Sequence, residues 1–319
     1  MKTIGIAGMG KIGWRLQKRL EAMGHKVVFT FRRKMLLSFE QLLEKYKPDA
    51  VFVAISTLDQ GEAELALILA CAKAGIPVIT CAKGALAYHA KVLNPFIPLI
   101  GYSAAVGGGT GILQIMKWRS GTWDFQPTQI FTSINGSFSL LGAVAEAERC
   151  SVIEAAEAAS AKTIHDGCAE PGVIDGPSFL REEGNDVKRK TCIVPWVISG
   201  GELCITPNNL EVIQGRKLDE IREGCRFVVS FTNYEPHDEP EVFGEGFRAV
   251  VGKWHLTGGW RLKEKLPEGG VWIPPGAGNA IHVTEGELGK SEKYSSSGPG
   301  AGAEPTTTAM INDLRAYLP

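Results

Sequence analysis

The sequence has no long apolar run, no charge excess of either sign and no paired cysteines. No stretch approaches the ~20 apolar residues that a helix needs to cross a bilayer. The first residues enter a candidate strand directly, so we expect no signal peptide. Lysine and arginine number 34 against 35 aspartates and glutamates, giving a net charge of −1. We therefore expect neither nucleic acid nor a membrane as a partner.

The cysteines are scattered and form neither a CxxC pair nor a zinc-binding spacing. An odd, unpaired set is typical of reduced thiols, so we expect a cytoplasmic protein. The seven positions are Cys71, Cys81, Cys150, Cys168, Cys192, Cys204 and Cys225.

What the chain does contain is the segment TIGIAGMGKIG near its N-terminus, with the pattern GxGxxG. The pattern follows a short apolar run and precedes a candidate helix at residues 14–23, and a second apolar run at residues 26–31 completes a βαβ unit. Glycines in this context let the backbone approach a pyrophosphate at a helix N-terminus. The pattern predicts dinucleotide binding, with structural glycines as the alternative. The candidate contacts are Gly8, Gly10, Lys11, Ile12 and Gly13.

The end of the second apolar run indicates which dinucleotide binds. NAD sites place a carboxylate there for the ribose 2′-hydroxyl, whereas this chain has Arg32, Arg33 and Lys34. Guanidinium groups bind phosphate bidentately, which favours NADP, with its 2′-phosphate, over NAD. Solvated loop charges are the alternative explanation, and NAD then stays possible.

Strand and helix signals alternate through the first hundred residues, with candidate strands at 49–55, 77–80 and 99–102 and a helix at 61–74. Beyond residue 129 we expect a strand at 131–134, a helical region to about 161, antiparallel strands within 224–260, a strand at 280–284 and a helix at 306–318. The predicted fold class is α/β, a Rossmann-type doubly wound parallel sheet, plus an α+β substrate and dimerisation domain with a mixed sheet. Residues 1–128 and 298–319 form the first domain, and residues 129–297 the second.

A second group of polar residues lies in the segment CAEPGVIDGPSFLREEGNDVKRKTCI. Asp186 and Lys190 are four apart on a candidate helix that Asn185 would cap, so they share a face. Glu170 precedes them in a candidate loop. The pair is either a surface ion pair or part of a site in which the carboxylates bind a polar substrate and the lysine moves a proton.

Several segments, in order, resemble homoserine dehydrogenases over most of the chain. They are IAGMGKIG, VITCAKGALA, YSAAVGGGTGIL, INGSFSLL, GCAEPGV, NDVKRK, GNAIHV and GPGAGAEPT. The resemblance is to a short form without the aspartate kinase and C-terminal regulatory domains of some relatives. It implies NAD(P)-dependent interconversion of L-homoserine and L-aspartate 4-semialdehyde, a step of threonine and methionine biosynthesis, by a homodimer.

The resemblance also implies roles for individual residues. Glu170 and Asp186 would bind the substrate, and Lys190 and Lys83 would stand at the reacting oxygen, with Lys190 as the proton donor. Further cofactor contacts would come from the ends of strands and from two glycines: Ser56, Thr57, Lys83, Gly167 and Gly302. A monovalent cation would bind at the carbonyls of the glycine-rich loop, Val106, Gly108 and Thr110.

Three features depart from the family pattern. Ser103 stands where the family has a cation-binding glutamate, which leaves the cation open. The spacing from Glu170 to Asp186 is longer than the family's, which could reshape the substrate pocket. Pro195 falls in the helix that carries Lys190, where a proline costs about 3 kcal/mol or kinks the helix.

Two other functions are compatible with the sequence. The same scaffold could act on a different amino-acid-like alcohol or aldehyde, which the longer spacing favours. A protein that binds NADP without catalysis, as a sensor, is the other. The presence of both Lys83 and Lys190 argues against a sensor.

Overall fold

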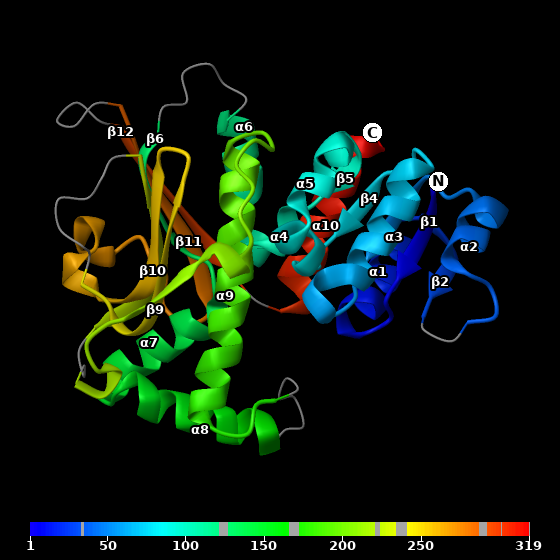
Figure 1. Cartoon of the computed structure of the whole chain (residues 1–319). Helices are drawn as coiled ribbons and strands as arrows, with labels where there is room; N and C mark the ends of the chain where they lie inside the picture. The colour runs from blue at the N-terminus through cyan, green and yellow to red at the C-terminus, as the bar shows by residue number, and fades with distance from the viewer. Residues whose placement is uncertain are drawn as a thin grey trace. The chain divides into compact units, whose positions relative to one another are not determined.

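The computed structural model describes residues 1–32, 35–120, 127–165, 172–220, 224–233, 241–286, 292–300 and 302–318. The chain forms two compact units, whose elements are labelled in Figure 1. The first comprises Met1–Lys117, Cys192–Thr206 and Gly302–Pro319, and the second Trp118–Thr191 and Pro207–Ala301. Compared with the predicted division, the first unit ends earlier and also takes in Cys192–Thr206.

The first unit is built on a five-stranded sheet in the order β2-β1-β3-β4-β5, with every pair parallel. Its strands are β1 (Thr3–Ala7), β2 (Lys26–Phe31), β3 (Ala50–Val53), β4 (Val78–Thr80) and β5 (Ile100–Gly101). The order reverses between β1 and β3. In doubly wound sheets, ligands bind beyond the carboxyl ends of the strands at such a reversal.

Helices connect these strands across both faces of the sheet. They are α1 (Lys11–Ala22), α2 (Phe39–Tyr46), α3 (Glu62–Lys73), α4 (Gly84–Tyr88), α5 (Ala90–Leu93) and α10 (Ala303–Tyr317). The steps β1 to β2 and β3 to β4 run in opposite directions, so right-handed crossovers put α1 and α3 on opposite faces. The helix α10 packs beside α1, and α2 packs beside α3. This is the predicted doubly wound arrangement.

The core of the first unit lies between the sheet and the pair α1 and α10. Ile4, Ile6 and Phe52 from the strands are fully buried there against Leu16 of α1 and Met310 of α10. Strands covered on both faces read as continuous apolar runs, which is why the periodicity of the sequence located them. The C-terminal helix thus completes the core that holds the helix after GxGxxG in place.

The second unit contains a seven-stranded sheet in the order β12-β11-β6-β8-β10-β9-β7. Its strands are β6 (Pro127–Ser133), β7 (Glu211–Gln214), β8 (Cys225–Thr232), β9 (Phe243–Val251), β10 (Trp254–Leu262), β11 (Gly278–Glu285) and β12 (Glu292–Pro299). Neighbouring strands in the described part of the chain all pair antiparallel. The fold class is confirmed, with the detail that this sheet is antiparallel where a mixed sheet was expected.

The helices that accompany this sheet are α7 (Gly136–Glu148), α8 (Val152–His165) and α9 (Gly176–Ile198), and α6 (Ile112–Ser120) leads into the unit. Phe138 of α7 packs on Phe227 and Trp260, with ring centroids 4.7 and 5.1 Å away. The expected single helical region is two helices, because Arg149 takes a left-handed conformation with φ of 53° and ends α7.

Helix α9 is longer than the sequence indicated, because it begins at Gly176, ten residues before the start that an Asn185 cap would give. Asp175 accepts a hydrogen bond from the backbone N–H of Ser178, 2.8 Å away, so the cap lies here and the prediction for Asn185 was wrong. The helix continues through Pro195 to Ile198. The segment that lengthens the spacing between Glu170 and Asp186 is therefore largely the first turns of this helix.

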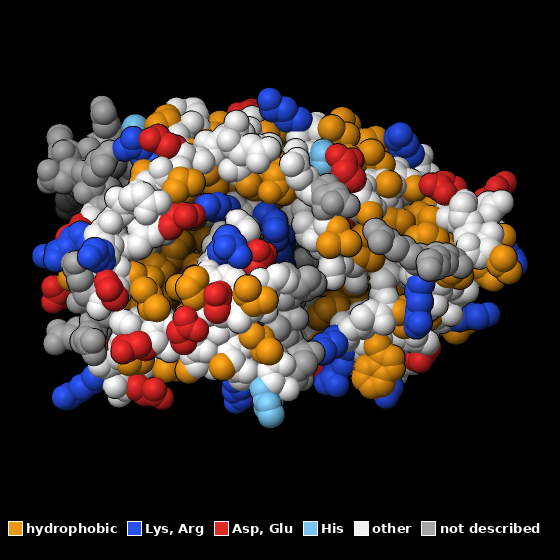
Figure 2. All heavy atoms as spheres, turned by 60° about the horizontal axis from the view of Figure 1, so that its bottom comes forward, with side chains coloured by type: hydrophobic (Ala, Val, Ile, Leu, Met, Phe, Trp, Pro, Cys, Tyr) orange, Lys and Arg blue, Asp and Glu red, His pale blue; other side chains and the backbone are white. Residues whose placement is uncertain are grey.

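The surface shows no dominant charge. Figure 2 shows acidic and basic side chains interspersed over the visible face, with hydrophobic side chains between them, in keeping with the net charge of −1. Among the described residues, no helix has the length and apolar character that crossing a membrane requires.

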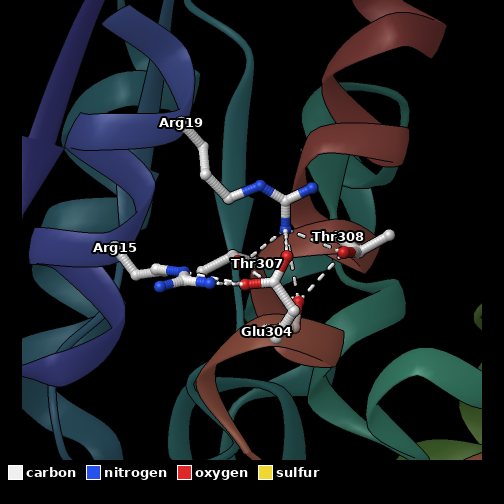
Figure 3. A network of polar contacts seen from close by, with 5 residues as sticks. All are labelled: Arg15, Arg19, Glu304, Thr307 and Thr308. Carbon is white, nitrogen blue, oxygen red and sulfur yellow. Dashed lines mark hydrogen bonds and ion pairs between the residues drawn. The ribbon is translucent and has the colours of Figure 1, made fainter. Parts of the chain in front are cut away.

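A polar network joins the start of α10 to α1 (Figure 3). The guanidinium Nε of Arg15 lies 2.7 Å from Oε2 of Glu304, and Nη1 of Arg19 lies 3.2 Å from Oε1. Arg19 also donates to the hydroxyls of Thr307 and Thr308, at 2.9 and 2.8 Å. The network fixes the first turn of α10, which Gly302 precedes, against the helix that follows GxGxxG.

Replacing Glu304 with glutamine is expected to lower the free energy of unfolding by about 0.2–1 kcal/mol, because these ion pairs are solvent-exposed. The loss should shrink as salt is added. Thermal melts of Glu304→Gln in low and high salt measure it, with Glu44→Gln, an exposed glutamate on α2, as the matched control. Equal losses in both variants would contradict the assignment of stability to this network.

Candidate functional site

The three glycines of GxGxxG are required, or permitted, for different structural reasons. Gly8 has a φ of +96°, and a Cβ there would overlap the carbonyl oxygen of Ala54 at the end of β3. A Cβ on Gly13 would overlap the carbonyl oxygen of Gly8, so α1 packs directly against the turn. Gly10 has ordinary extended backbone, and no described atom lies within 4 Å of its Cβ position. Gly8 and Gly13 therefore serve packing, while Gly10 leaves an open approach to the start of α1.

This geometry fits a dinucleotide pyrophosphate. Gly10 is the N-cap of α1 and its side of the turn is open, so a ligand can approach the first N–H groups of the helix. Lys11 is the exposed first residue of α1, and Ile12 packs on the core. The site lies where the strand order reverses, as expected for a doubly wound sheet.

Of the residues expected to distinguish NADP from NAD, the structure describes only Arg32. Arg32 directly follows β2 and is exposed, and its backbone N–H donates to the Sδ of Met35 at 3.3 Å. Arg33 and Lys34 lie outside the described residues. The binding of a 2′-phosphate by this segment stays a prediction.

The loops after β3 and β4 carry three further candidates. Ser56 is exposed, and Thr57 and Lys83 are partly buried. The Thr57 hydroxyl donates to Glu64 on α3, at 2.6 Å, and accepts from the backbone N–H of Gly84, at 3.2 Å. The structure thus brings Thr57 directly beside the residue that follows Lys83. The sequence did not single out Glu64, because an acidic first turn with Glu62 and Glu64 is ordinary for a helix.

Gly302 and the glycine-rich loop are also in the first unit. Gly302 precedes α10 with a φ of +109°, which only glycine adopts readily. Val106 is buried, Gly108 to Thr110 forms a 3₁₀ turn, and the Thr110 hydroxyl donates to the carbonyl of Gly107 at 2.6 Å. The cation at this loop stays a prediction.

Ser103, which replaces the family's glutamate, is buried and bound to a carboxylate from another element. Asp313 of α10 accepts from the Ser103 hydroxyl and backbone N–H, at 2.5 and 2.8 Å. Burial raises the pKa of Asp313, while the hydrogen bonds from Ser103 oppose that shift. Ser103, the departure from the family pattern, is thus bonded to a carboxylate from α10.

In the second unit, Asp186 and Lys190 form a largely buried ion pair. Their Oδ2 and Nζ atoms are 2.6 Å apart, and the side chains are 20% and 11% exposed. The Lys190 ammonium also donates to the backbone carbonyl of Ile134, 2.9 Å away, at the end of β6. This geometry excludes the alternative of a freely solvated surface pair, and it holds the lysine in one place.

Two residues that the sequence did not single out complete this cluster. The Asn135 side-chain amide donates to both Asp186 and Glu183, at 3.1 and 2.7 Å, and its carbonyl oxygen accepts from the N–H of Phe138 as the cap of α7. Glu183, Asp186 and Lys190 lie at i, i+3 and i+7 on α9, so they share one face. That spacing is the signal that could have identified Glu183. Asn135 is joined to them only by the fold.

The carboxyl of Glu183 is electrostatically unfavourable in its ionised form. Burial raises its pKa, and the charge of Asp186 raises it further, while the hydrogen bond from Asn135 acts in the opposite direction. Lys190 pairs directly with Asp186 rather than with Glu183. Lys190 and a hydrogen bond from Ser137 also favour the ionised form of Glu183, but burial and Asp186 outweigh them. Gly167 and Glu170, the other residues expected here, lie outside the described part of the chain.

The fold is similar to that of solved homoserine dehydrogenases. One is a hyperthermophilic archaeal mutant enzyme in complex with NADPH, with a TM-score of 0.68 and 19% identity over 99% of this chain and 97% of that one. For the enzyme of Thiobacillus denitrificans the TM-score is 0.64 and the sequence identity is 19%, over 99% of this chain and 73% of that one. For the enzyme of Thermoplasma acidophilum the TM-score is 0.64 and the sequence identity is 16%, over 99% of this chain and 98% of that one. The expected resemblance is confirmed at the level of the fold.

No family model matches the sequence, and a search among curated proteins found no match either. The structural similarity extends over nearly the whole chain, whereas the sequence similarity is low. The assignment of an activity therefore depends on the residues themselves, at the dinucleotide turn of the first unit and in the Asp186–Lys190 cluster of the second.

Gly10→Ala should weaken NADPH binding by roughly tenfold or more, equivalent to about 1.4 kcal/mol, because a methyl group would enter the open space before α1. Its melting temperature should stay near that of the wild type, since its backbone conformation suits alanine. Gly13→Ala should instead lower stability by about 1–3 kcal/mol through overpacking. Fluorescence titration with NADPH and thermal melts separate the two effects, and equal stability losses would contradict the distinction.

Glu183→Gln should raise the melting temperature by a few degrees at neutral pH. The raised pKa of Glu183 means that the folded state binds its proton more tightly than the unfolded state, so ionisation opposes folding above that pKa. The difference should disappear below the ordinary glutamate pKa of about 4.3. Melts from neutral to acidic pH, with Glu182→Gln as the neighbouring control, measure it. A variant that is less stable than the wild type at neutral pH would refute the analysis.

Proposed function

We propose that the protein is an NADP-dependent oxidoreductase that interconverts L-homoserine and L-aspartate 4-semialdehyde, as a cytoplasmic homodimer. The observation that carries the proposal is the buried pair of Lys190 and Asp186, held by the Ile134 carbonyl and the Asn135 amide. A unit with an open dinucleotide-binding turn accompanies it in the same chain. The fold it shares with homoserine dehydrogenases, one of them solved with NADPH, supports the same conclusion.

The cofactor, when bound, exchanges a hydride between nicotinamide C4 and the carbinol carbon of the substrate. The open turn at Gly10 and the start of α1 would bind its pyrophosphate. Arg32 and Arg33 would bind its 2′-phosphate, and Ser56, Thr57 and Gly302 would contact it from the loops. NAD is the second candidate, with Arg32 and Arg33 then serving only as solvated loop charges.

Lys190 is the proposed proton donor in the reducing direction. An aldehyde oxygen that receives a hydride at its carbon becomes an alkoxide, and a fixed ammonium group both stabilises that charge and supplies the proton. The contacts with Asp186 and the Ile134 carbonyl orient the ammonium. Lys83 is the proposed second cation, and in the oxidising direction the proton returns to Lys190.

The carboxylates account for an amino-acid substrate. With Glu183 and Asp186 ionised and Lys190 protonated, these three groups carry two negative charges and one positive charge. A substrate ammonium group would compensate the excess and favour the ionised form of Glu183. Glu170, which the resemblance assigns to the same role, would add a further acceptor. Two neighbouring carboxylates beside a single cation repel each other, so we propose that the ammonium group occupies this position.

A different amino-acid-like alcohol or aldehyde is the second candidate substrate. The observation in its favour is the additional length of α9 ahead of Asp186, which the start of the helix at Gly176 reveals. Such a substrate would use the same two lysines and the same charge balance. The length of its side chain would differ.

The test is to mix the protein with L-homoserine and NADP, and separately with NAD, and to follow the absorbance of the reduced nicotinamide. Faster reduction of NADP supports both the reaction and the role of the arginines. Lys190→Ala should lower turnover by about 10²–10⁴-fold, the range for loss of a general acid, and leave NADPH affinity unchanged.

The matched control is Lys188→Ala on the same helix, because Lys188 pairs with Glu245 at 3.0 Å instead. Retained activity in Lys190→Ala would refute the assignment of the donor. Binding of NADPH without oxidation of homoserine, followed by oxidation of another amino alcohol, would establish the second candidate. No oxidation of any amino alcohol would leave a cofactor-binding sensor.

A further inference from the structure

Glu64 is a fully buried carboxylate in the first turn of a largely apolar helix. It lies on α3, in the sequence EAELALILACAK, and its relative exposure is 0%. A buried carboxylate is costly unless hydrogen bonds satisfy it. An apolar residue would pack at this position without that cost, and the proposed reaction does not use Glu64. Its presence therefore calls for a structural reason among its neighbours.

Its two oxygens bind two different loops. Oε1 accepts from the Thr57 hydroxyl, at 2.6 Å, in the loop after β3. Oε2 accepts from the backbone N–H of Ala85, at 2.7 Å, in the first turn of α4 after β4. Thr57 closes the circuit, because its oxygen accepts from the N–H of Gly84 at 3.2 Å.

The backbones of the two loops are in direct contact at this point. A Cβ on Gly61, whose φ is +84°, would overlap the backbone of Gly84 and Ala85. A Cβ on Gly84 would lie 2.5 Å from Oε2 of Glu64 and 2.6 Å from Cγ2 of Thr57. The two loops pack directly against each other, and Glu64 provides the side-chain link between them.

Lys83 is the residue immediately before this junction. It is the N-cap of α4, with a φ of −97° and a ψ of −25°, and Gly84 and Ala85 follow it. The pKa of the Cys81 thiol is affected by both Lys83 and Glu64. Burial raises its pKa to about 11, Lys83 lowers it and Glu64 raises it. Both charges thus act at the same point beyond the end of β4.

We propose that Glu64 is a positioning residue that joins the loops after β3 and β4, and so fixes Thr57 for cofactor binding and Lys83 for the reaction. The role of Lys83 rests on the proposed function, whereas the role of Thr57 requires only that the dinucleotide binds. Glu64 itself touches neither substrate nor cofactor. It acts through the two loops, and its negative charge lies within electrostatic reach of Lys83.

The test uses Glu64→Gln, which keeps the size of the side chain but replaces one acceptor oxygen with a donor. Either Thr57 or Ala85 then loses its partner. We expect NADPH affinity to fall several-fold and kcat to fall by roughly tenfold or more, since displacements of about 1 Å can cost 10²-fold. KM for homoserine should stay within about twofold. Glu64→Ala should show larger losses.

The matched control is Glu62→Gln, two residues earlier on the same helix, where the side chain is 67% exposed and faces His89. Its affinity and turnover should match those of the wild type. Thr57→Val is the second variant, because it removes the hydroxyl at nearly constant volume. In the double variant with Glu64→Gln the losses should be less than multiplicative, since both changes break the same hydrogen bond.

Wild-type NADPH affinity and kcat in Glu64→Gln would overturn the proposal, as would equal losses in Glu62→Gln. If Glu64→Gln does not fold, full activity of Thr57→Val would overturn it. If the wild type does not oxidise homoserine, the proposed function fails, and NADPH affinity still decides whether Glu64 positions Thr57. A loss of kcat with unchanged NADPH affinity would overturn only the claim that Glu64 positions Thr57 for cofactor binding.

Discussion

The close approach of backbones at the carboxyl edge of the parallel sheet is the constraint on which the first unit depends. Gly8 lies against the carbonyl of Ala54, and Gly13 lies against the carbonyl of Gly8, with no room for a side chain. This contact sets the position of α1 over the sheet. It therefore also sets where α10 packs beside α1 and where the open turn at Gly10 faces. The glycines serve binding mainly by permitting this packing.

Satisfaction of buried polar groups organises the second unit in a similar way. The side chain of Asn135 caps α7 and donates to Glu183 and Asp186 of α9. The ammonium of Lys190 is held by Asp186 and by the last carbonyl before Asn135. Since partly satisfied buried networks are unfavourable, this cluster fixes α9, β6 and α7 together. The same contacts that stabilise it aim the lysine.

The sequence was most informative where partners lie close along the chain. The limits of β2 were predicted correctly, and Asp186 and Lys190 were paired because both lie on one helix. The edge strand β12 was missed because the stretch YSSSGP is polar and half exposed, with no apolar alternation. Asn135 and Glu64 could not be connected to their partners, since those contacts cross between elements that only the fold brings together.

Glu64 and Glu183 are two carboxyls whose surroundings differ, and the difference indicates different roles. Each carboxyl is withdrawn from water where an apolar or neutral side chain would cost less. Both oxygens of Glu64 accept hydrogen bonds from protein donors, Thr57 and the N–H of Ala85. Glu183 accepts from Asn135 and feels the charge of Lys190, but burial and the charge of Asp186 still raise its pKa. We therefore assign a positioning role to Glu64, and we propose Glu183 as part of the site for the substrate's ammonium group.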